Sequence, residues 1–573
     1  MKKFILTCFL VSIYLYGSAQ SKVAESPPGQ DLFYRPGLYA GNRPAELAVL
    51  DTEAEFHGQE SESSSAQQEV VLIYGEIINP DSLGSLTIIF SEGFLPEGEA
   101  MVDSTLLVQL DHGTFFDGVL DPRVQKFQTH IPVESDYARL MFKIGERTVF
   151  KDMLVFPGDS IKVGIDLQQF SVVFDGPQAF WFEVQYTLHR ALIANQFSQA
   201  RVLLENDRDE LLDQKDFRAQ LELQESVFGS RIAIYEFGKD GLDLELSLLM
   251  DSSINRIPGW LVLQTFHKHI PEERFRLLQS QLIGSYYAEH LATFRQYHHG
   301  MPLALGDSLS ASHAKQVLPE LLAKLDKDLK TSLQLGLSPG ALDLAREWIY
   351  SEKILREEPL EVLIAEKYAS PIEEKILYSA FLKIAETSQL SSDTWKVYQN
   401  YLEGSSVEKE FNVLKSTFEP GNYLAKATFH DLNGKKLVLE DFTGKPTLLY
   451  FYFSGCTHSG NYFRNYLQPF YREMGDKLGL QVIAVSVDND SDLWKSQLST
   501  YSSKEIVNLN FPNERAADWL RQYRVYGYPR SMLLDKEGKV LSYILDGKDY
   551  SEFSSNIISL LKNQHTNENQ IVH

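Results

Sequence analysis

The chain has 573 residues and a hydrophobic share of 43%, so at about 100–200 residues per domain it is too long for one compact domain and has room for about three. Acidic residues outnumber basic ones by 78 to 54, giving a net charge of −24, which argues against nucleic acid or an anionic membrane surface as the main partner. Cys8 and Cys456 are the only cysteines, too few for a disulfide-stapled scaffold or a cysteine-rich zinc or iron–sulfur centre.

Residues 1–19 have the pattern of a secretory signal peptide. Lys2 and Lys3 precede an apolar run over 4–16, and small residues lie before a cut after Ala19. That run is too short to span a bilayer, and no later stretch is both long enough and free of charge. We therefore expect a periplasmic protein with no transmembrane segment in its mature chain.

Cleavage after residue 19 would remove Cys8 and leave Cys456 as the single cysteine, so no internal disulfide could form. The alternative is a lipid anchor on Cys8. Thr7 is a poor residue before a lipidated cysteine, and the first seven residues leave no room for an apolar segment.

Residues 20–68 have little periodicity and an acidic, serine-rich end, which predicts a disordered linker. Residues 69–176 change to short β-prone runs with turn clusters between them, which predicts an antiparallel β-sandwich. A β-meander packed on the next domain is the alternative. The runs are Val70–Ile78, Leu86–Phe90, Leu106–Leu110 and Ile161–Ile165.

Residues 177–417 have a helical period and predict a helical region. One apolar stripe is formed by Leu318, Leu321, Leu322, Leu325, Leu329 and Leu333. Ser370-Pro371-Ile372-Glu373 is a helix start, with Ser as cap, Pro at the first helical position and Glu reaching back. Because no fixed repeat is found, a helical bundle or irregular layer is favoured over a tetratricopeptide array.

His298 and His299 are the one feature of the helical region that could suggest a metal. Adjacent residues on a helix point in different directions, and no carboxylate or cysteine accompanies the two histidines at ligand spacing. We therefore expect a solvent-facing pair and no metal site.

Residues 418–563 alternate strands and helices, which predicts an α/β domain, and 564–573 form a tail. An apolar strand over 446–453 ends just before Cys456, which begins a helix of about 15–20 residues. A second strand over 481–487 ends at Asp488. A third over 531–535 follows Tyr528-Pro529 and turns into a fourth over 539–545.

These landmarks in this order resemble the TlpA/ResA-type thioredoxin-like proteins, which are related to the AhpC/TSA proteins. The N-terminal part also resembles the β-domain that precedes such domains in secreted Bacteroidetes proteins, through Gly75-Glu76-Ile77 and Phe156-Pro157-Gly158-Asp159-Ser160. The resemblance implies a multidomain protein with a C-terminal thioredoxin fold.

The resemblance also implies roles for individual residues. Cys456 matches the nucleophilic cysteine, Ser459 stands where the resolving cysteine should be, and Pro529 falls on the cis-proline that faces the sulfur. A thiol at a helix N-terminus is independently expected to have a lowered pKa, because the helix end favours the thiolate. His458, Tyr528 and Arg530 are candidate modulators beside it.

Several positions depart from the family pattern. Ser459 can hydrogen-bond a thiolate but cannot attack a mixed disulfide. Gly455 replaces a Trp just before the cysteine, and Tyr452 stands where another Trp is usual. Tyr450 takes the position where thioredoxins often bury an acid. These changes predict a specialised or lapsed catalyst.

The sequence therefore predicts thiol–disulfide exchange through the single Cys456, with substrate protein thiols or disulfides and an external thiol or reductase as partners, and no cofactor. The alternative is a redox-inactive binding protein of the cell envelope. A peroxiredoxin is disfavoured because Phe453 and Leu449 break its Pro-x-x-x-Thr-x-x-Cys pattern. Copper is disfavoured because Cys456 and His458 supply only two ligands.

Overall fold

The computed structural model describes residues 70–79, 85–96, 100–112, 123–145, 147–229, 232–238, 240–251, 253–387, 390–545, 547 and 549–570. The expected signal peptide and the expected linker over 20–68 lie outside these residues, as does Cys8. No helix within these ranges is long and apolar enough to cross a membrane.

The first part of the described chain is built from two sheets with the strand orders β4-β5-β1-β8-β9 and β3-β2-β6-β7. Burial alternates along β1 (Val70–Ile78), as expected of a strand with one face in a core. The other strands are β2 (Leu86–Phe94), β3 (Ala100–Val108), β4 (Asp111–His112), β5 (Val124–Pro132), β6 (Ala138–Ile144), β7 (Arg147–Val155), β8 (Ser160–Asp166) and β9 (Ser171–Asp175).

Side chains of the two sheets meet in one hydrophobic core. Phe127 of β5 lies with its ring centroid 6.5 Å from that of Phe142 of β6, which belongs to the other sheet. This contact supports the expected sandwich. The sheets are not purely antiparallel, because β1 pairs with β8 in parallel over Leu72–Ile78.

The middle part is mainly helical, and the leucine stripe lies on α9 (Ser308–Leu335) with most of its members buried. Two short parallel strands that the helical period did not indicate, β10 (Arg201–Glu205) and β11 (Ile232–Glu236), pair within it. The other helices are α2 (Ala179–Ser198), α3 (Arg208–Asp213), α4 (Lys215–Phe228), α5 (Asp240–Met250), η3 (Ile254–Arg256), α6 (Trp260–Phe266), α7 (Glu272–Thr293), the π-helix η4 (Phe294–Gly300), α8 (Met301–Leu305), α10 (Pro339–Leu355), α11 (Leu360–Lys367), α12 (Ile372–Thr387), α13 (Ser392–Leu402) and α14 (Glu408–Phe418).

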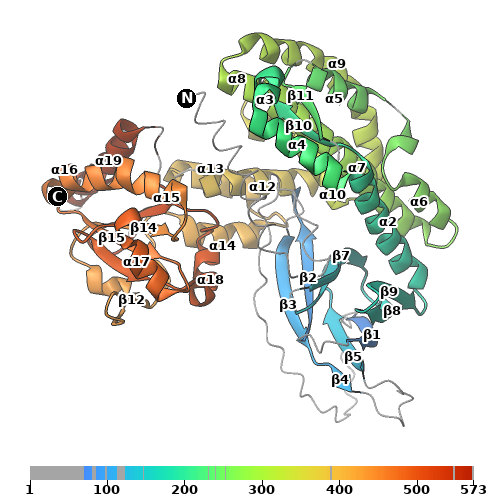
Figure 1. Ribbon diagram of the computed structural model, residues 1–573, viewed down its shortest axis with the longest axis horizontal. Helices are drawn as coiled ribbons and strands as arrows, with labels where there is room; N and C mark the ends of the chain where they lie inside the picture. Colours follow the sequence, from blue (N-terminus) through green and yellow to red (C-terminus); the bar gives the residue numbers. More distant parts are fainter. Residues whose placement is uncertain are drawn as a thin grey trace. The chain divides into compact units, whose positions relative to one another are not determined.

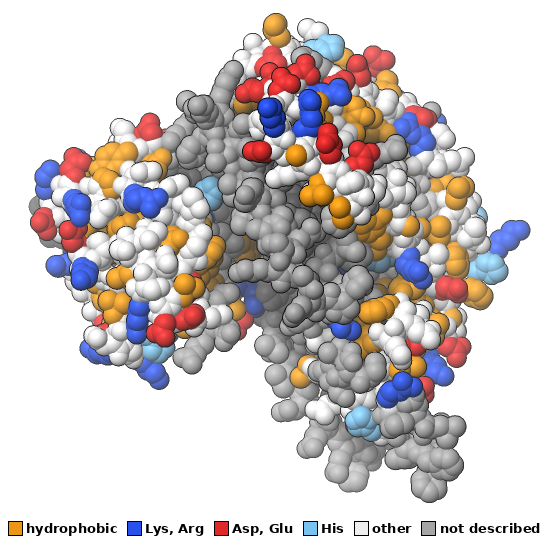
Figure 2. Space-filling model, viewed as in Figure 1, with side chains coloured by type: hydrophobic (Ala, Val, Ile, Leu, Met, Phe, Trp, Pro, Cys, Tyr) orange, Lys and Arg blue, Asp and Glu red, His pale blue; other side chains and the backbone are white. Residues whose placement is uncertain are grey.

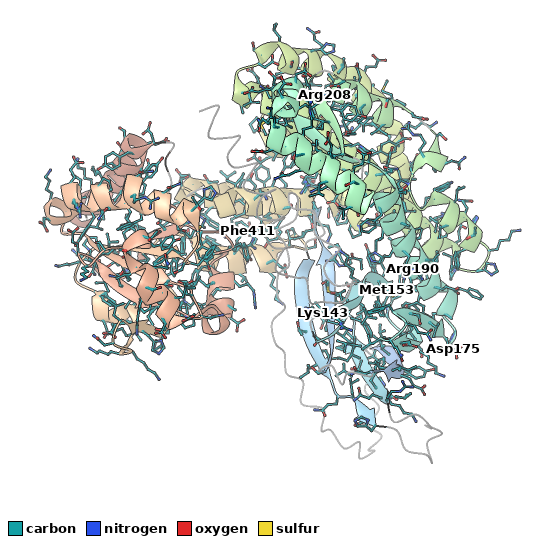
Figure 3. The ribbon with its side chains drawn as sticks, viewed as in Figure 1. Lys143, Met153, Asp175, Arg190, Arg208 and Phe411 are labelled. Carbon is teal, nitrogen blue, oxygen red and sulfur yellow. The ribbon has the colours of Figure 1, made fainter. Side chains whose placement is uncertain are left out.

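A helix does start after Ser370, but the predicted capping pattern is wrong, because Pro371 precedes the first helical residue and the Ser370 hydroxyl donates to an acid one residue further on. The helix α12 begins at Ile372, and the Ser370 hydroxyl bonds the carboxylate of Glu374 rather than that of Glu373. The same carboxylate accepts from the backbone N–H of Ser406, 2.9 Å away. Helices α12, α13 and α14 share an aromatic core, in which the Phe411 ring lies 5.2 Å from the Phe381 ring (Figure 3).

The C-terminal part is a seven-stranded sheet in the order β13-β12-β16-β15-β14-β17-β18 with helices around it (orange to red in Figure 1). Its strands are β12 (Phe429–Asp431), β13 (Lys436–Leu437), β14 (Thr447–Tyr452), β15 (Gln481–Ser486), β16 (Val507–Asn510), β17 (Arg530–Leu534) and β18 (Val540–Ser542). Its helices are η5 (Leu439–Phe442), α15 (Thr457–Tyr462), the π-helix η6 (Phe463–Leu467), α16 (Gln468–Leu478), α17 (Ser491–Tyr501), α18 (Asn513–Gln522) and α19 (Tyr550–Gln570).

Both faces of this sheet are covered, which explains why β14 is apolar without alternation. Leu448 and Tyr450 belong to one core cluster, whereas Leu449 and Phe451 belong to the other. Every residue of β14 is therefore buried. The strand pairs in parallel with β15 and antiparallel with β17, so it runs through the centre of the sheet and delivers Cys456 at its carboxyl end.

Candidate active site

Cys456 lies between the end of β14 and the start of α15. It is the N-cap residue of α15, and its backbone N–H bonds the carbonyl of Phe453, 3.3 Å away. Gly455, directly before it, has φ +96, a left-handed conformation that side chains rarely adopt. The backbone turn thus gives a physical reason for Gly455 where a Trp was expected from the resemblance.

The Cys456 sulfur is in contact with two backbone groups. The N–H of Ser459 donates to Sγ over 3.4 Å, and the carbonyl of Tyr528 lies 3.6 Å from Sγ. The peptide bond between Tyr528 and Pro529 is cis, as the resemblance implied. Cys456 is 8% exposed, so only a small part of this residue is open to a reacting partner.

Ser459 is brought next to the sulfur, but through its backbone rather than its hydroxyl. The residue is fully buried, and its Oγ has no hydrogen-bond partner among the described residues. The expected hydroxyl-to-sulfur bond is therefore absent here. The Ser459 carbonyl accepts a hydrogen bond from the hydroxyl of Tyr450, 2.9 Å away.

Tyr450 and Tyr452 form an aromatic layer under this turn. Their rings stack with centroids 5.3 Å apart, and the Tyr452 hydroxyl accepts a hydrogen bond of 3.0 Å from the indole of Trp494. Burial, and secondarily the neighbouring tyrosines, raises the pKa of Tyr450 above its usual range. Tyr450 therefore stays a neutral hydrogen-bond donor and does not replace the buried acid as a titrating group.

Asp488 is a residue of this site that the sequence did not single out. Its carboxylate accepts from the Ser454 N–H at 2.9 Å, from the Ser454 hydroxyl at 2.7 Å and from the Ser486 hydroxyl at 2.6 Å. It lies at the carboxyl end of β15, beside the end of β14. The carboxyl ends of parallel strands meet at one edge of the sheet. The position of Asp488 just after its strand could therefore have indicated that it lies beside the site.

The candidate modulators differ in their placement. His458 is exposed on α15, whereas Tyr528 and Arg530 are half-buried. Burial raises the pKa of Tyr528 to about 12, and the charge of Asp488 adds to the effect. The Tyr528 ring packs edge-on against the ring of Phe453, with centroids 5.6 Å apart.

The histidine pair does not face solvent as expected. His298 is fully buried and His299 is half-buried, both in the π-helix η4. The Nδ1 of His298 accepts from the N–H of Gly238 over 3.3 Å, and its Nε2 has no hydrogen-bond partner in the described structure. Burial lowers the pKa of His298 to about 4. Within the described residues, no group of three or more His, Cys, Asp or Glu could hold a metal ion.

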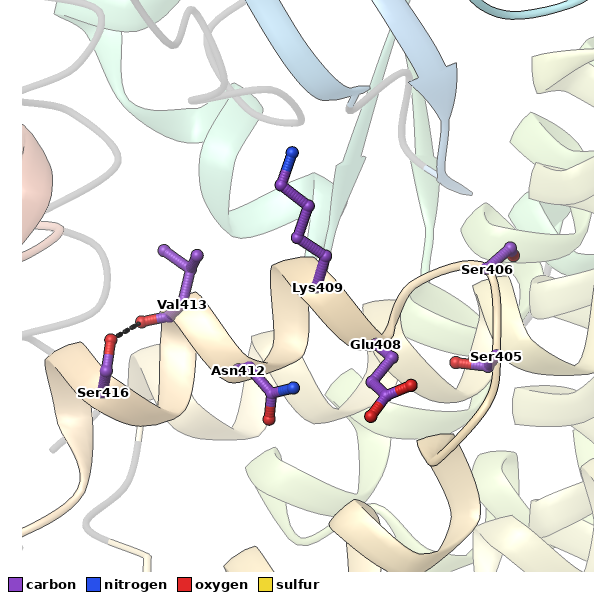
Figure 4. A pocket seen from close by; sticks show the side chains of 7 residues that line it. All are labelled: Ser405, Ser406, Glu408, Lys409, Asn412, Val413 and Ser416. Atoms are coloured by element: carbon purple, nitrogen blue, oxygen red, sulfur yellow. Dashed lines mark hydrogen bonds between the residues drawn. The ribbon is translucent and has the colours of Figure 1, made fainter.

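A shallow hollow of about 680 Å³ lies on α14 and the loop before it. Figure 4 shows Lys409 and Val413 on one side of α14 and Glu408 and Asn412 on the other, with the Ser416 hydroxyl turned back onto the carbonyl of Val413. Its lining is Ser405, Ser406, Glu408, Lys409, Asn412, Val413 and Ser416. Acidic and basic side chains are mixed over the face seen in Figure 2. The hollow contains neither a thiol nor a buried charge, so Cys456 remains the site with defined chemistry.

Comparison with known proteins finds relatives of the C-terminal domain. Residues 444–540 match the family described as Thioredoxin-like. The thiol-disulfide oxidoreductase ResA of Bacillus cereus is 30% identical over 150 residues, which cover 26% of this chain and 76% of the relative. Peroxiredoxin Bcp of Escherichia coli is 24% identical over 158 residues, covering 25% of this chain and 94% of the relative.

Among solved structures, the thioredoxin domain of a thiol-disulfide oxidoreductase from Bacteroides vulgatus is 27% identical with a TM-score of 0.22, covering 25% of this chain and 97% of that one. All of these matches span about a quarter of the chain.

Proposed function

This chain belongs, through its C-terminal domain, to the thioredoxin-like family that includes the thiol-disulfide oxidoreductase ResA, and from that premise we propose that it exchanges thiols and disulfides through the sulfur of Cys456. The observation that carries the proposal is the placement of this sulfur. Cys456 caps a helix, receives the N–H of Ser459, and lies against the carbonyl that precedes the cis-proline Pro529.

In the proposed reaction the Cys456 thiolate attacks one sulfur of a substrate disulfide. A disulfide forms between Cys456 and that half of the substrate, the substrate's own S–S bond breaks, and its second sulfur leaves as a thiolate. An external thiol then attacks the mixed disulfide at the substrate's sulfur. That attack returns Cys456 as a thiolate and releases the substrate half as a disulfide with the external thiol.

Resolution from outside is required because Ser459 occupies the position of a second thiol. A serine hydroxyl cannot replace that thiol, because exchange requires a thiolate to attack the disulfide. Cys456 is the free cysteine of the described chain. The proposed partners are therefore substrate protein disulfides or thiols and an external thiol or reductase. The signal-peptide pattern of residues 1–19 supports a reaction in the periplasm.

A redox-inactive binding protein of the cell envelope is the second candidate. It is favoured by the serine at position 459, which removes ordinary two-thiol turnover. In that case the thioredoxin fold would supply a peptide-binding surface and Cys456 would remain a buried thiol.

Trapping at Cys456 distinguishes these two candidates. The full chain with Cys8→Ser, incubated with a model disulfide, is expected to gain one mixed disulfide at Cys456, identified by mass spectrometry. The matched variant Cys8→Ser/Cys456→Ser is expected to gain none. A Cys8→Ser chain that forms no adduct over a pH range where free thiols react would establish the second candidate instead.

Introducing the missing thiol is expected to create two-thiol turnover. In the variant Ser459→Cys the new side chain lies one helical turn from Cys456, in a position where the backbone already approaches the sulfur. We expect the variant to reduce insulin with a dithiol reductant at a rate above that of the wild type. If the variant forms an internal disulfide but does not reduce insulin, the rest of the site no longer supports turnover. Ser459→Ala is the control.

A further inference from the structure

The loop that carries Cys456 is held by the carboxylate of Asp488, which lies two residues after the end of the neighbouring strand β15. Between β14 and α15 the chain passes through Ser454 and Gly455, and the N–H of Ser454 lies 2.9 and 3.1 Å from the two oxygens of Asp488. The Ser454 hydroxyl adds a third contact of 2.7 Å. Asp488 therefore binds both polar groups through which Ser454 can donate.

Asp488 is itself held firmly. The hydroxyl of Ser486, a fully buried residue, donates to its carboxylate over 2.6 Å. The amide of Asn510, which is 4% exposed on β16, donates to the carbonyl of Asp488 over 2.9 Å and to that of Ser486 over 3.2 Å. A carboxylate with so many partners cannot rotate without breaking several charge-assisted hydrogen bonds.

A second side chain completes the support of the loop. The hydroxyl of Tyr501 accepts from the N–H of Gly455 over 2.7 Å, and the N–H of Cys456 is already bonded to Phe453. The three N–H groups from Ser454 to Cys456 are thus all used. Asp488 and Tyr501 are the side chains that bond the two residues directly before Cys456.

We propose that Asp488 is a positioning residue for Cys456, acting through Ser454 to hold the sulfur against the N–H of Ser459 and the carbonyl of Tyr528. The inference rests on the proposed thiol–disulfide exchange. Thioredoxins often bury an acid at the position that Tyr450 takes in β14, and Tyr450 stays neutral. The proposal therefore assigns the acid that acts on the cysteine to the end of β15 instead. Asp488 acts through geometry and does not itself accept a proton from the sulfur.

The test compares Asp488→Ala with Asp488→Asn in the full chain carrying Cys8→Ser. The rate of attack on the aromatic disulfide DTNB and the pH profile of Cys456 alkylation by iodoacetamide are measured for each. Displacement of a reacting atom by about 1 Å costs about a hundredfold in rate, and we expect a loss of that order for Asp488→Ala, with its alkylation profile moved to higher pH.

The conservative variant separates geometry from charge. In Asp488→Asn the amide oxygen can still accept from the Ser454 N–H, and the amide N–H can donate to the serine hydroxyls, which rotate. We therefore expect it to recover much of the rate. Asp490→Asn is the matched control, because Asp490 caps α17 over 2.8 Å and Asn is an equally good cap.

Three outcomes would overturn the proposal. Equal losses in the Asn and Ala variants would mean that the charge acts, not the geometry. An alkylation profile moved to lower pH would mean that Asp488 repels the thiolate. Lowered melting temperatures with an unchanged rate and profile would mean a purely structural role. A wild-type chain without exchange activity would defeat the proposed function alone, since the alkylation profiles would still test Asp488.

Discussion

Replacing Asp159 by Asn is expected to lower the free energy of unfolding by about 3–5 kcal/mol, the cost of breaking a buried ion pair by removing one partner. Asp159 is 2% exposed, and its carboxylate lies 2.5 Å from the guanidinium of Arg274 on α7. The other carboxylate oxygen accepts from the N–H of Phe156, 2.9 Å away. The substitution leaves the Arg274 charge partly buried without its counterion.

The surroundings of Arg274 make this loss difficult to compensate. Its guanidinium lies 4.4 Å from the ring centroid of Phe156 and 5.2 Å from that of Trp181. Aromatic faces attract the cation but supply no hydrogen-bond acceptor of carboxylate strength. The Asp159 pair therefore joins the turn between β7 and β8 to α7 through one desolvated contact.

Urea unfolding of the full chain, followed by circular dichroism, measures this effect. Asp175→Asn is the control, because Asp175 (labelled in Figure 3) is a largely exposed partner of Lys162 at 3.9 Å, and exposed pairs contribute little. The double variant Asp159→Asn/Arg274→Met is expected to recover part of the loss, since no unpaired charge remains. An Asp159→Asn chain as stable as the control would show that the pair contributes nothing net.

The sequence predicted elements best where the local pattern and the tertiary environment agree. The apolar runs over 446–453 and 481–487 form adjacent parallel strands. They could be predicted because strands buried on both faces are continuously apolar. The placement of Cys456 at the end of one of them followed directly. The resemblance then located the cis-proline at Pro529, which no local pattern indicates.

Features that depend on contacts distant in sequence were missed. The parallel pairing of β1 with β8 joins strands separated by most of the N-terminal part, and nothing in either strand specifies that partner. The Asp488 bonds to Ser454 have the same origin. The spacing predicted that Ser459 lies next to the sulfur of Cys456. It did not predict that the backbone N–H makes the contact in place of the hydroxyl, because the side-chain rotamer decides where the hydroxyl points.

The expectation for His298 was wrong because it rested on the absence of metal ligands at the right spacing and did not consider what packs around the ring. A π-helix carries an extra residue in its turn, which shifts every following side chain around the axis relative to a regular α-helix. The residue opposite the ring also matters. A Cβ on Gly241 would lie 3.0 Å from Cε1 of His298, which is tighter than side chains usually pack, so the glycine leaves room for the buried ring.

Burial of His298 is expected to make the protein less stable in acid by about 3 kcal/mol between pH 6.5 and pH 4. Burial lowers the pKa of the folded imidazole to about 4 from its usual value of 6.5. Between these values the unfolded chain takes up a proton that the folded chain does not. Stability is therefore complete above the unfolded value, falls as the pH decreases through this window, and changes no further below the folded value.

Two substitutions remove the titration while keeping different parts of the side chain. His298→Asn retains an acceptor for the N–H of Gly238, and His298→Phe retains the ring volume. Either variant is expected to lose some stability at neutral pH through cavity formation or an unpaired N–H. Both should show a smaller difference in unfolding free energy between neutral pH and pH 4 than the wild type, by about 3 kcal/mol.

The decisive quantity is the difference in unfolding free energy between neutral pH and pH 4, because a simple packing defect lowers the unfolding free energy equally at both. His458→Asn is the matched control, since His458 is exposed on α15 and its loss should leave the pH dependence unchanged. If the His298 variants keep the full pH dependence of the wild type, the buried imidazole is not the group whose protonation unfolds the chain. A reduced dependence in both variants would assign that acid sensitivity to the π-helix η4.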